Sequence, residues 1–387
     1  MLGQLRVRRV DLGVVAIGAA DGAAELIGYR EPIAGNYKVL RGGSAATIVS
    51  GRPLVGDGVI VRQASGTLAL YLSDDQGVVT SSSTDGGATW SAPAATGSHD
   101  VGDVQSVAVR PDGTTLYSQD GTGFVKVFTG PAGGPTNVFP SCCGYAETLA
   151  VDTGGLTQIA FWSNATGQSG YLYGPVGGPY QNLSGSKESL SNDARVPLVA
   201  DAAGNAFLAW QTGYPEADAF IVWTYRGGSL QHSVRFTGKY PKPDPHMALG
   251  VDASNRLWAV WTRQKAVWAA RSRSHGAHFG AAVHVAEPGS VYQLEAGARP
   301  DGSVDVVANT GSSLQSQRLL PGLTVTGSRS AARVLDDGFP LAGVTLRGGG
   351  RTLHTNAQGR ASLAGVKPHT ALSVTTPGYA PAAFRVP

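Results

Sequence analysis

One turn pattern recurs along the chain at nearly even intervals and limits the possible folds more than any other feature. A glycine or asparagine suited to a tight turn follows a short apolar run at residues 22, 66, 113, 155, 204, 255 and 302, spaced 42 to 51 residues apart. Repeats of about 40 to 50 residues that hold several short strands are typical of the blades of a β-propeller. The sequence therefore predicts an all-β propeller. Six and seven blades both stay open, because the turn at Gly22 is weak.

The repeat at 195–236 shows the strands that we expect in each blade. Apolar residues alternate with polar ones over 195–200, 206–210, 220–225 and 231–236, which predicts four strands separated by turns. The 54 glycines among 387 residues exceed the ordinary share of about 7% and exclude a solenoid of helical repeats. Trp162, Trp210 and Trp261 end the second strand of three repeats, so we expect them in the core between blades.

The stretch 83–90 predicts a stapled hairpin turn, because Asp-Gly-Gly tolerates positive φ and short polar side chains can bond nearby amides. Its Ser-x-Asp-x-Gly-x-Thr-Trp spacing, formed by Ser83, Asp85, Gly87, Thr89 and Trp90, resembles the Asp-box (BNR repeat) of sialidase-like β-propellers. In that family the box is a structural staple between two outer strands, remote from the active site. The resemblance therefore implies a fold and leaves function open.

After residue 326 the pattern changes. The runs Gly-Phe-Pro-Leu-Ala-Gly-Val at 338–344, Thr-Asn-Ala-Gln-Gly-Arg-Ala at 355–361 and Pro-Gly-Tyr at 377–379 resemble a carboxypeptidase-regulatory-like, transthyretin-like module. That family forms a small β-sandwich at the ends of surface and secreted bacterial proteins and serves as a spacer or adhesion domain. We therefore expect a propeller over 1–326 and a sandwich over 327–387.

Composition excludes several classes of protein. The net charge is only +3 and the basic residues are scattered, so we expect no nucleic-acid partner. No run of 18 apolar residues occurs, so no membrane span is expected. Asp11 and Asp21 interrupt the apolar N-terminal stretch, so we expect a strand there and find no clear signal peptide, and the sequence leaves open whether the N-terminus is native. An extracellular or cell-surface monomer follows from the resemblances.

The two cysteines are adjacent, Cys142 and Cys143. They can form a vicinal disulfide or stay as two free thiols, and the sequence leaves both open. A zinc site needs more ligands than the neighbourhood offers, so we expect neither a metal nor a cofactor.

One constellation of polar residues offers a candidate binding site. Residues that begin the first strand of a blade lie at the mouth of the central channel in a propeller. About six or seven residues before successive turns, these positions hold Gln105, Tyr145, Arg195, His246 and Glu295. Glu147 and Tyr292 are close neighbours of these positions, and Asp57 occupies a similar place in the repeat of the 83–90 turn. The competing interpretation is that strand starts are polar because they are exposed. Tyr292 and Glu295 would meet only across a bulge, since residues three apart on a strand face opposite sides.

The sialidase-like resemblance does not extend to catalysis. That family uses three arginines, a tyrosine activated by a glutamate, and an aspartate acid/base. No Arg-Ile-Pro motif precedes the turn at 83–90, and Arg195 is the best single candidate for one of the arginines. The first hypothesis is a non-catalytic propeller that binds a glycan or protein at its channel mouth. The alternatives are a sialidase-like exo-glycoside hydrolase and a purely structural stalk. The stretch 142–165 also resembles uncharacterised secreted bacterial propellers, which implies no reaction.

Overall fold

The computed structural model contains strands and turns, and no helix among the residues that it describes. The described residues are 5–6, 15–17, 26–30, 36–41, 44–49, 54–63, 65–98, 102–121, 124–130, 133–139, 144–165, 168–183, 196–212, 217–240, 246–252, 254–299, 301–310 and 314–387. Cys142, Cys143 and Arg195 lie outside these residues.

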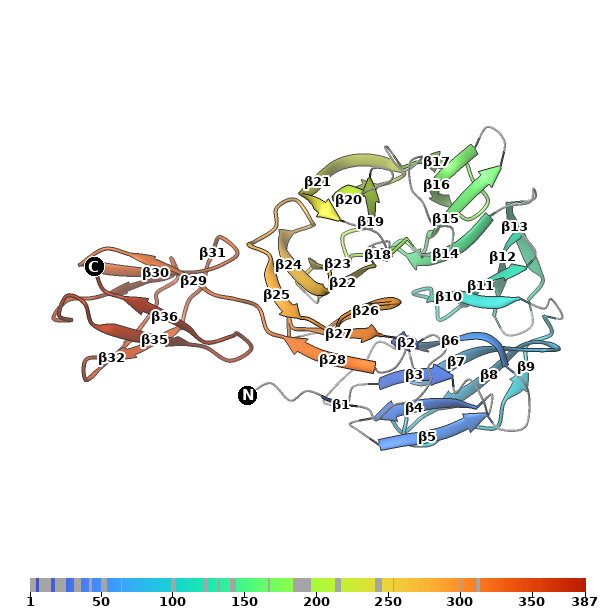
Figure 1. The fold of residues 1–387 in the computed structure, drawn as a ribbon, viewed down its shortest axis with the longest axis horizontal. Helices are drawn as coiled ribbons and strands as arrows, with labels where there is room; N and C mark the ends of the chain where they lie inside the picture. Colours follow the sequence, from blue (N-terminus) through green and yellow to red (C-terminus); the bar gives the residue numbers. More distant parts are fainter. Residues whose placement is uncertain are drawn as a thin grey trace.

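Between Leu5 and Leu319 the strands form seven four-stranded antiparallel sheets (Figure 1). The first three sheets contain β2 (Val15–Ile17), β3 (Leu26–Arg30), β4 (Tyr37–Arg41) and β5 (Ser44–Val49); β6 (Leu54–Arg62), β7 (Leu68–Asp74), β8 (Gly77–Ser83) and β9 (Ala94–Ala95); and β10 (Asp103–Val109), β11 (Thr115–Gly121), β12 (Phe124–Thr129) and β13 (Pro135–Phe139). Each sheet runs outward in chain order, as short turns between successive strands require.

The next three sheets repeat this order. They contain β14 (Gly144–Val151), β15 (Thr157–Ala165), β16 (Gln168–Pro175) and β17 (Gln181–Asn182); β18 (Leu198–Ala200), β19 (Asn205–Thr212), β20 (Ala217–Arg226) and β21 (Ser229–Tyr240); and β22 (Met247–Val251), β23 (Arg256–Arg263), β24 (Ala266–Ser274) and β25 (Val283–Ala286). The strands of the fifth sheet match the four expected from the pattern over 195–236.

The seventh sheet closes the ring. It contains β26 (Gln293–Ala298), β27 (Val304–Asn309), β28 (Leu314–Leu319) and, on its outer edge, β1 (Leu5–Arg6). The innermost strands β2, β6, β10, β14, β18, β22 and β26 each contact the next, and β26 contacts β2 (Figure 1). The predicted all-β propeller is confirmed.

Apolar side chains fill the space between neighbouring sheets. Trp210 and Trp261, exposed by 1% and 4%, belong to one cluster shared by the fourth, fifth and sixth sheets. The ring of Trp210 lies 4.3 Å from that of Tyr171, and the ring of Trp261 lies 5.3 Å from that of Phe220, between centroids. Trp162 is half-buried against the same cluster. The tryptophans therefore hold sheets together, as the pattern predicted.

The recurrent turn has the same backbone hydrogen bonds in six sheets. In the fifth sheet, the amide of Gly204 donates to the carbonyl of Asp201, and the amide of Asp201 donates to the carbonyl of Asn205. In the other five sheets, the turn with these two hydrogen bonds begins at Gln63, Arg110, Asp152, Asp252 and Arg299. The fourth residue of this turn needs a positive φ, which glycine adopts without strain. Its φ is +81° to +85° in the five sheets where it is a glycine, and +56° at Asn255 in the sixth sheet. The repeat register read from the sequence is therefore confirmed for six turns.

The turn at 83–90 is stapled by its aspartate. The carboxylate of Asp85 accepts hydrogen bonds from the hydroxyls of Ser83 (2.8 Å) and Thr89 (2.6 Å) and from the amides of Ala88 and Thr89 (both 2.9 Å). These bonds to the charged form hold the pKa of Asp85 well below its ordinary value. The Trp90 indole donates to the carbonyl of Gly87 at 3.2 Å and packs under the turn.

Two further four-stranded sheets follow the ring. One contains β29 (Thr324–Gly327), β30 (Ala331–Asp336), β31 (Phe339–Pro340) and β34 (Arg360–Ser362). The other contains β33 (Arg351–His354), β32 (Thr345–Gly348), β35 (Ala371–Thr375) and β36 (Ala382–Arg385). Both sheets contribute to one buried apolar cluster that includes Val334, Leu346 and Val374. We call residues 324–387 the C-terminal unit, because β29 pairs with β30 across the predicted boundary at 326/327.

Candidate functional site

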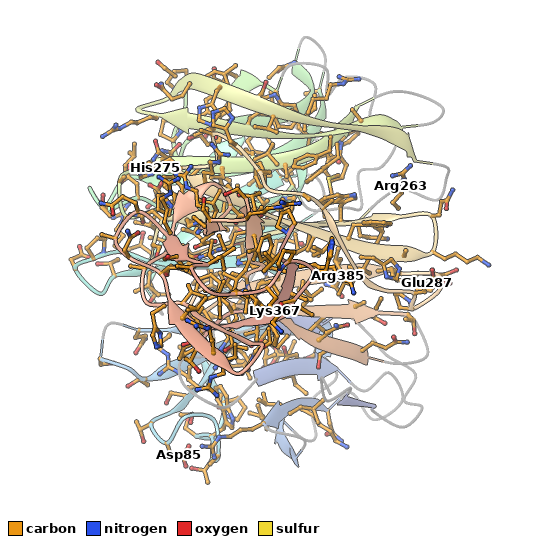
Figure 2. All side chains as sticks on the ribbon, turned by 90° about the vertical axis from the view of Figure 1, so that its left-hand side faces the viewer. Asp85, Arg263, His275, Glu287, Lys367 and Arg385 are labelled. Carbon is orange, nitrogen blue, oxygen red and sulfur yellow. The ribbon has the colours of Figure 1, made fainter. Side chains whose placement is uncertain are left out.

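The candidate residues lie at one end of the inner strands, on the face opposite the Asp85 turn. His246 precedes β22, and its carbonyl accepts a hydrogen bond from the amide of Thr262, near the turn between β23 and β24. In Figure 2 the ring is seen edge-on, with Arg263 and Glu287 at one face and His275 and Asp85 at the other. We call the face of His246 and Arg263 the strand-start face.

Three inner strands bulge at the candidate positions. In β10, Val104 pairs with Gln119 and Ser106 with Ser118, so Gln105 is an extra residue. In β14, residues 146–147 face one residue of β15, and in β6, residues 55–57 face one residue of β7. Gln105, Glu147 and Asp57 therefore each lie in a bulge. Bulges redirect side chains and are common next to functional sites.

Each bulge adjoins a hydrogen bond from the neighbouring sheet. The Tyr37 hydroxyl donates to the carbonyl of Gly58 at 3.1 Å, which ends the first bulge. The amide of Val104 donates to the hydroxyl of Ser73, and the amide of Leu149 donates to the hydroxyl of Ser106, both at 2.9 Å. These polar links hold the irregular ends of β6, β10 and β14 against the neighbouring sheet. No sequence signal identified them, because their partners occupy different positions in each repeat.

The candidate side chains differ in their exposure. Tyr292 is 67% exposed, whereas Glu147 is completely buried. Gln105, His246 and Glu295 are half-buried. For Asp57 and Tyr145 the structure describes the backbone alone, within β6 and β14. Tyr292 is therefore the most accessible of the described candidate side chains, and Glu147 is the least accessible.

Tyr292 and Glu295 are not brought together by a bulge. The pairing of β26 with β27 is continuous from Gln293 opposite Asn309 to Ala298 opposite Val304. Tyr292 directly precedes this regular segment, and its amide donates to the carbonyl of Asn309 at 2.8 Å. Because side chains alternate along a regular strand, the pair lacks the arrangement of a tyrosine activated by a glutamate.

The arrangement offers hydrogen bonding and an aromatic surface. An amide, an imidazole and a carboxylate, from Gln105, His246 and Glu295, begin three inner strands of one ring. Such groups can bond hydroxyls or peptide groups of a ligand. Within the described part of the chain, no group of three or more His, Cys, Asp or Glu side chains could hold a metal ion.

Two solved structures with TM-scores above 0.5 support the fold. Catalytically inactive H270A virginiamycin B lyase from Staphylococcus aureus with quinupristin superposes with a TM-score of 0.53 at 11% identity, covering 83% of this chain and 99% of that one. The selenomethionine form of that lyase gives 0.51 at 9% identity, covering 82% and 99%. The extracellular domain of the one-component system BT4673 from B. thetaiotaomicron gives 0.49 at 12% identity, covering 99% and 48%.

These likenesses show the fold alone, because identities near 10% carry no site residues across. No protein-family profile and no curated protein matches the chain. The described segments contain no helix that is long and apolar enough to cross a membrane.

Proposed function

We propose that this protein is a non-catalytic propeller of the Asp-box type that binds a glycan or protein ligand at its strand-start face. The observation that carries the proposal is the coincidence of three inner-strand bulges with Asp57, Gln105 and Glu147. A regular ladder would stabilise the ring at least as well as a bulged one, so bulges repeated at one end favour a function there.

The exposed ring of Tyr292 supports a ligand with apolar as well as polar surface. Large aromatic side chains exposed to solvent are enriched where proteins bind partners. Tyr292 directly precedes β26, so its exposed ring lies at the start of the strand that carries Gln293 and Glu295, with Glu295 facing the opposite side from Tyr292. This combination suits a saccharide, whose rings carry both C–H faces and hydroxyls, and it also suits a peptide.

A location outside the cell or on its surface, and a monomeric state, belong to the same proposal. They rest on the resemblance of 83–90 to the Asp-box and of the C-terminal unit to the carboxypeptidase-regulatory-like module. The division into a propeller over 1–326 and a sandwich over 327–387 also remains a proposal, which the shared apolar cluster of the C-terminal unit supports.

The test is a glycan-array and surface-protein binding screen with wild type, Tyr292→Ala and Glu295→Gln, run beside a fluorogenic sialoside assay. We expect binding without turnover, and a loss of at least tenfold in affinity for Tyr292→Ala. Leu156→Ala is the matched control, since Leu156 is also exposed but lies on the turn at the opposite face.

Two outcomes would contradict the proposal. Sialoside turnover that Arg195→Ala abolishes would establish the hydrolase. Binding that Tyr292→Ala and Glu295→Gln leave unchanged would place the ligand elsewhere on the protein.

A further inference from the structure

A buried ion-pair cluster joins the C-terminal unit to the sixth sheet of the ring. It consists of Asp252, Arg256 and Arg271 from the sixth sheet, and Asp336 and Asp337 from the hairpin between β30 and β31. The Arg271 guanidinium contacts Asp252 at 2.5 Å and Asp336 at 3.2 Å, so it bridges the two parts of the chain. Arg256 pairs with both Asp336 and Asp337.

These charges are removed from water. Arg256, Arg271 and Asp336 are each 6% exposed, and Asp252 is 3% exposed. Surface ion pairs contribute little, but a buried charge that loses its partner is strongly unfavourable. Asp336 and Asp337 supply two of the three carboxylates that face the two arginines in this buried cluster. The docked C-terminal unit therefore balances charge that the ring alone leaves in excess.

A second contact lies on the loop between β35 and β36. Within the unit, the Tyr379 hydroxyl donates to Asp336 at 2.7 Å, and the amide of Ala380 donates at 2.9 Å to the carbonyl of Pro321, in the segment that links β28 to β29. A Cβ on Gly378 would lie 3.7 Å from the carbonyl oxygen of Asp301 in the turn of the seventh sheet. One contact would allow rotation about the linker, whereas two separated contacts restrict the orientation.

Glycines on both sides leave room for the charged groups. A Cβ on Gly280 would lie 2.2 Å from Oδ1 of Asp337, and a Cβ on Gly338 would lie 2.4 Å from Nη2 of Arg273. Within the ring, a Cβ on Gly302 would lie 2.9 Å from Nη2 of Arg271, so this glycine leaves room for the bridging arginine. A larger residue at Gly280 or Gly338 would require these charged side chains to shift from their present positions. The surfaces are therefore complementary in shape as well as in charge.

We infer that the ion-pair cluster clamps the C-terminal unit onto the ring in one orientation, so that the chain acts as a single rigid body. The unit lies at the rim, beside the sixth and seventh sheets (Figure 1). The clamp engages the turn end of the sixth sheet, which is the face of His275 rather than the strand-start face (Figure 2). The unit thus projects from the ring at a set angle and leaves the strand-start face uncovered by these contacts.

Small-angle X-ray scattering of the full chain tests this inference. We expect the wild-type profile to fit one rigid shape. Asp336→Ala/Asp337→Ala removes the acidic half of the clamp, and we expect an increase in radius of gyration and maximum dimension. Lys367→Ala is the control, because it removes an exposed charge of the same unit, and its profile should match wild type.

The wild-type measurement alone can overturn the inference. A profile that requires many orientations of the C-terminal unit would show a flexible tether, whatever the variants do. If the double variant fails to fold, a thermodynamic cycle of Arg256→Ala and Asp336→Ala gives a second answer. Additive losses of stability would show that the two residues are uncoupled, whereas the clamp predicts that the second substitution costs far less after the first.

Discussion

The carboxylate of Asp201 accepts a hydrogen bond from Nδ1 of His275 at 2.7 Å across the boundary between the fifth and sixth sheets. The side chain of Asp201 is completely buried, whereas that of His275 is 43% exposed. Asn205 donates a second side-chain hydrogen bond to the same carboxylate at 2.8 Å. Burial raises the pKa of Asp201, but these bonds and the backbone amides outweigh burial and leave its pKa below the ordinary 3.8. The pair joins two turns that are far apart in the chain.

Removal of the imidazole should weaken the ring. His275→Ala leaves a buried carboxylate with one donor fewer, and we expect a loss of about 1 kcal/mol in the free energy of unfolding at pH 7. Because the pKa of Asp201 is lower in the folded state, this contribution is present above pH 3.8 and disappears as the pH falls below that value. Urea unfolding at pH 7 and at pH 3 measures both effects. His278→Ala, at an exposed neighbour, should leave stability unchanged. An equal loss for both variants would contradict the prediction.

Substitution of the aspartate that staples the turn at 83–90 should loosen the second sheet. Asp85→Asn keeps an oxygen for the amides of Ala88 and Thr89 but replaces Oδ2, which accepts from the Thr89 hydroxyl, with an NH2. It also removes the negative charge that strengthens these hydrogen bonds. We expect a lower thermal midpoint and a change in the fluorescence of Trp90, which packs under the turn. Asp75→Asn is the control, since Asp75 is exposed on the neighbouring turn of the same sheet. A midpoint that moves equally in both variants would show that the staple contributes nothing specific.

The first bulge leaves no space for a side chain. A Cβ on Gly58 would lie 2.5 Å from Cδ2 of Leu72 and 2.6 Å from the ring of Tyr37. Gly58→Ala should therefore destabilise the protein by about 1 to 3 kcal/mol, because the ring that bonds the Gly58 carbonyl must move. Chemical denaturation provides the measurement. Gly322→Ala meets no atom within 4 Å and should be close to neutral. If Gly58→Ala leaves the free energy of unfolding unchanged, the Tyr37 ring can move aside at little cost and the prediction is wrong.

The clamp should respond to pH through Asp337. Burial raises the pKa of Asp337 to about 6, and the neighbouring Asp336 adds to the effect, while Arg256, Arg271 and Arg273 oppose it. A carboxyl with a raised pKa binds protons more tightly in the docked state. The contribution of Asp337 to the attachment of the C-terminal unit should therefore increase as the pH falls from 7 to 5.

The contribution of Asp337 is isolated by comparison with Asp337→Asn, which cannot titrate. The difference in unfolding free energy between wild type and this variant should change between pH 7 and pH 5, in favour of wild type at the lower pH. A difference that stays constant over this range would show that Asp337 does not titrate there.

Part of the structure was predictable from short stretches of sequence. The recurrent turn needs a residue that tolerates positive φ at positions such as Gly113 and Asn255, and alternation around it determines which residues enter the core. The Asp85 turn is equally local, since every partner of the carboxylate lies within four residues. These signals were enough to predict strands, turns, repeat register and an all-β ring.

Other features depend on residues that meet only after the ring has formed. The pairing of β1 with β28 joins segments some three hundred residues apart, and Arg256 and Asp336 are 80 residues apart. The bulges of β6, β10 and β14 depend on how each inner strand fits against the next sheet, and no pattern within one strand reports that fit. The sequence alone determined the repeating unit, because turn geometry and alternation act over a few residues. The tertiary structure decided ring closure, the bulges and the clamp, because these arise from packing and charge burial between distant segments.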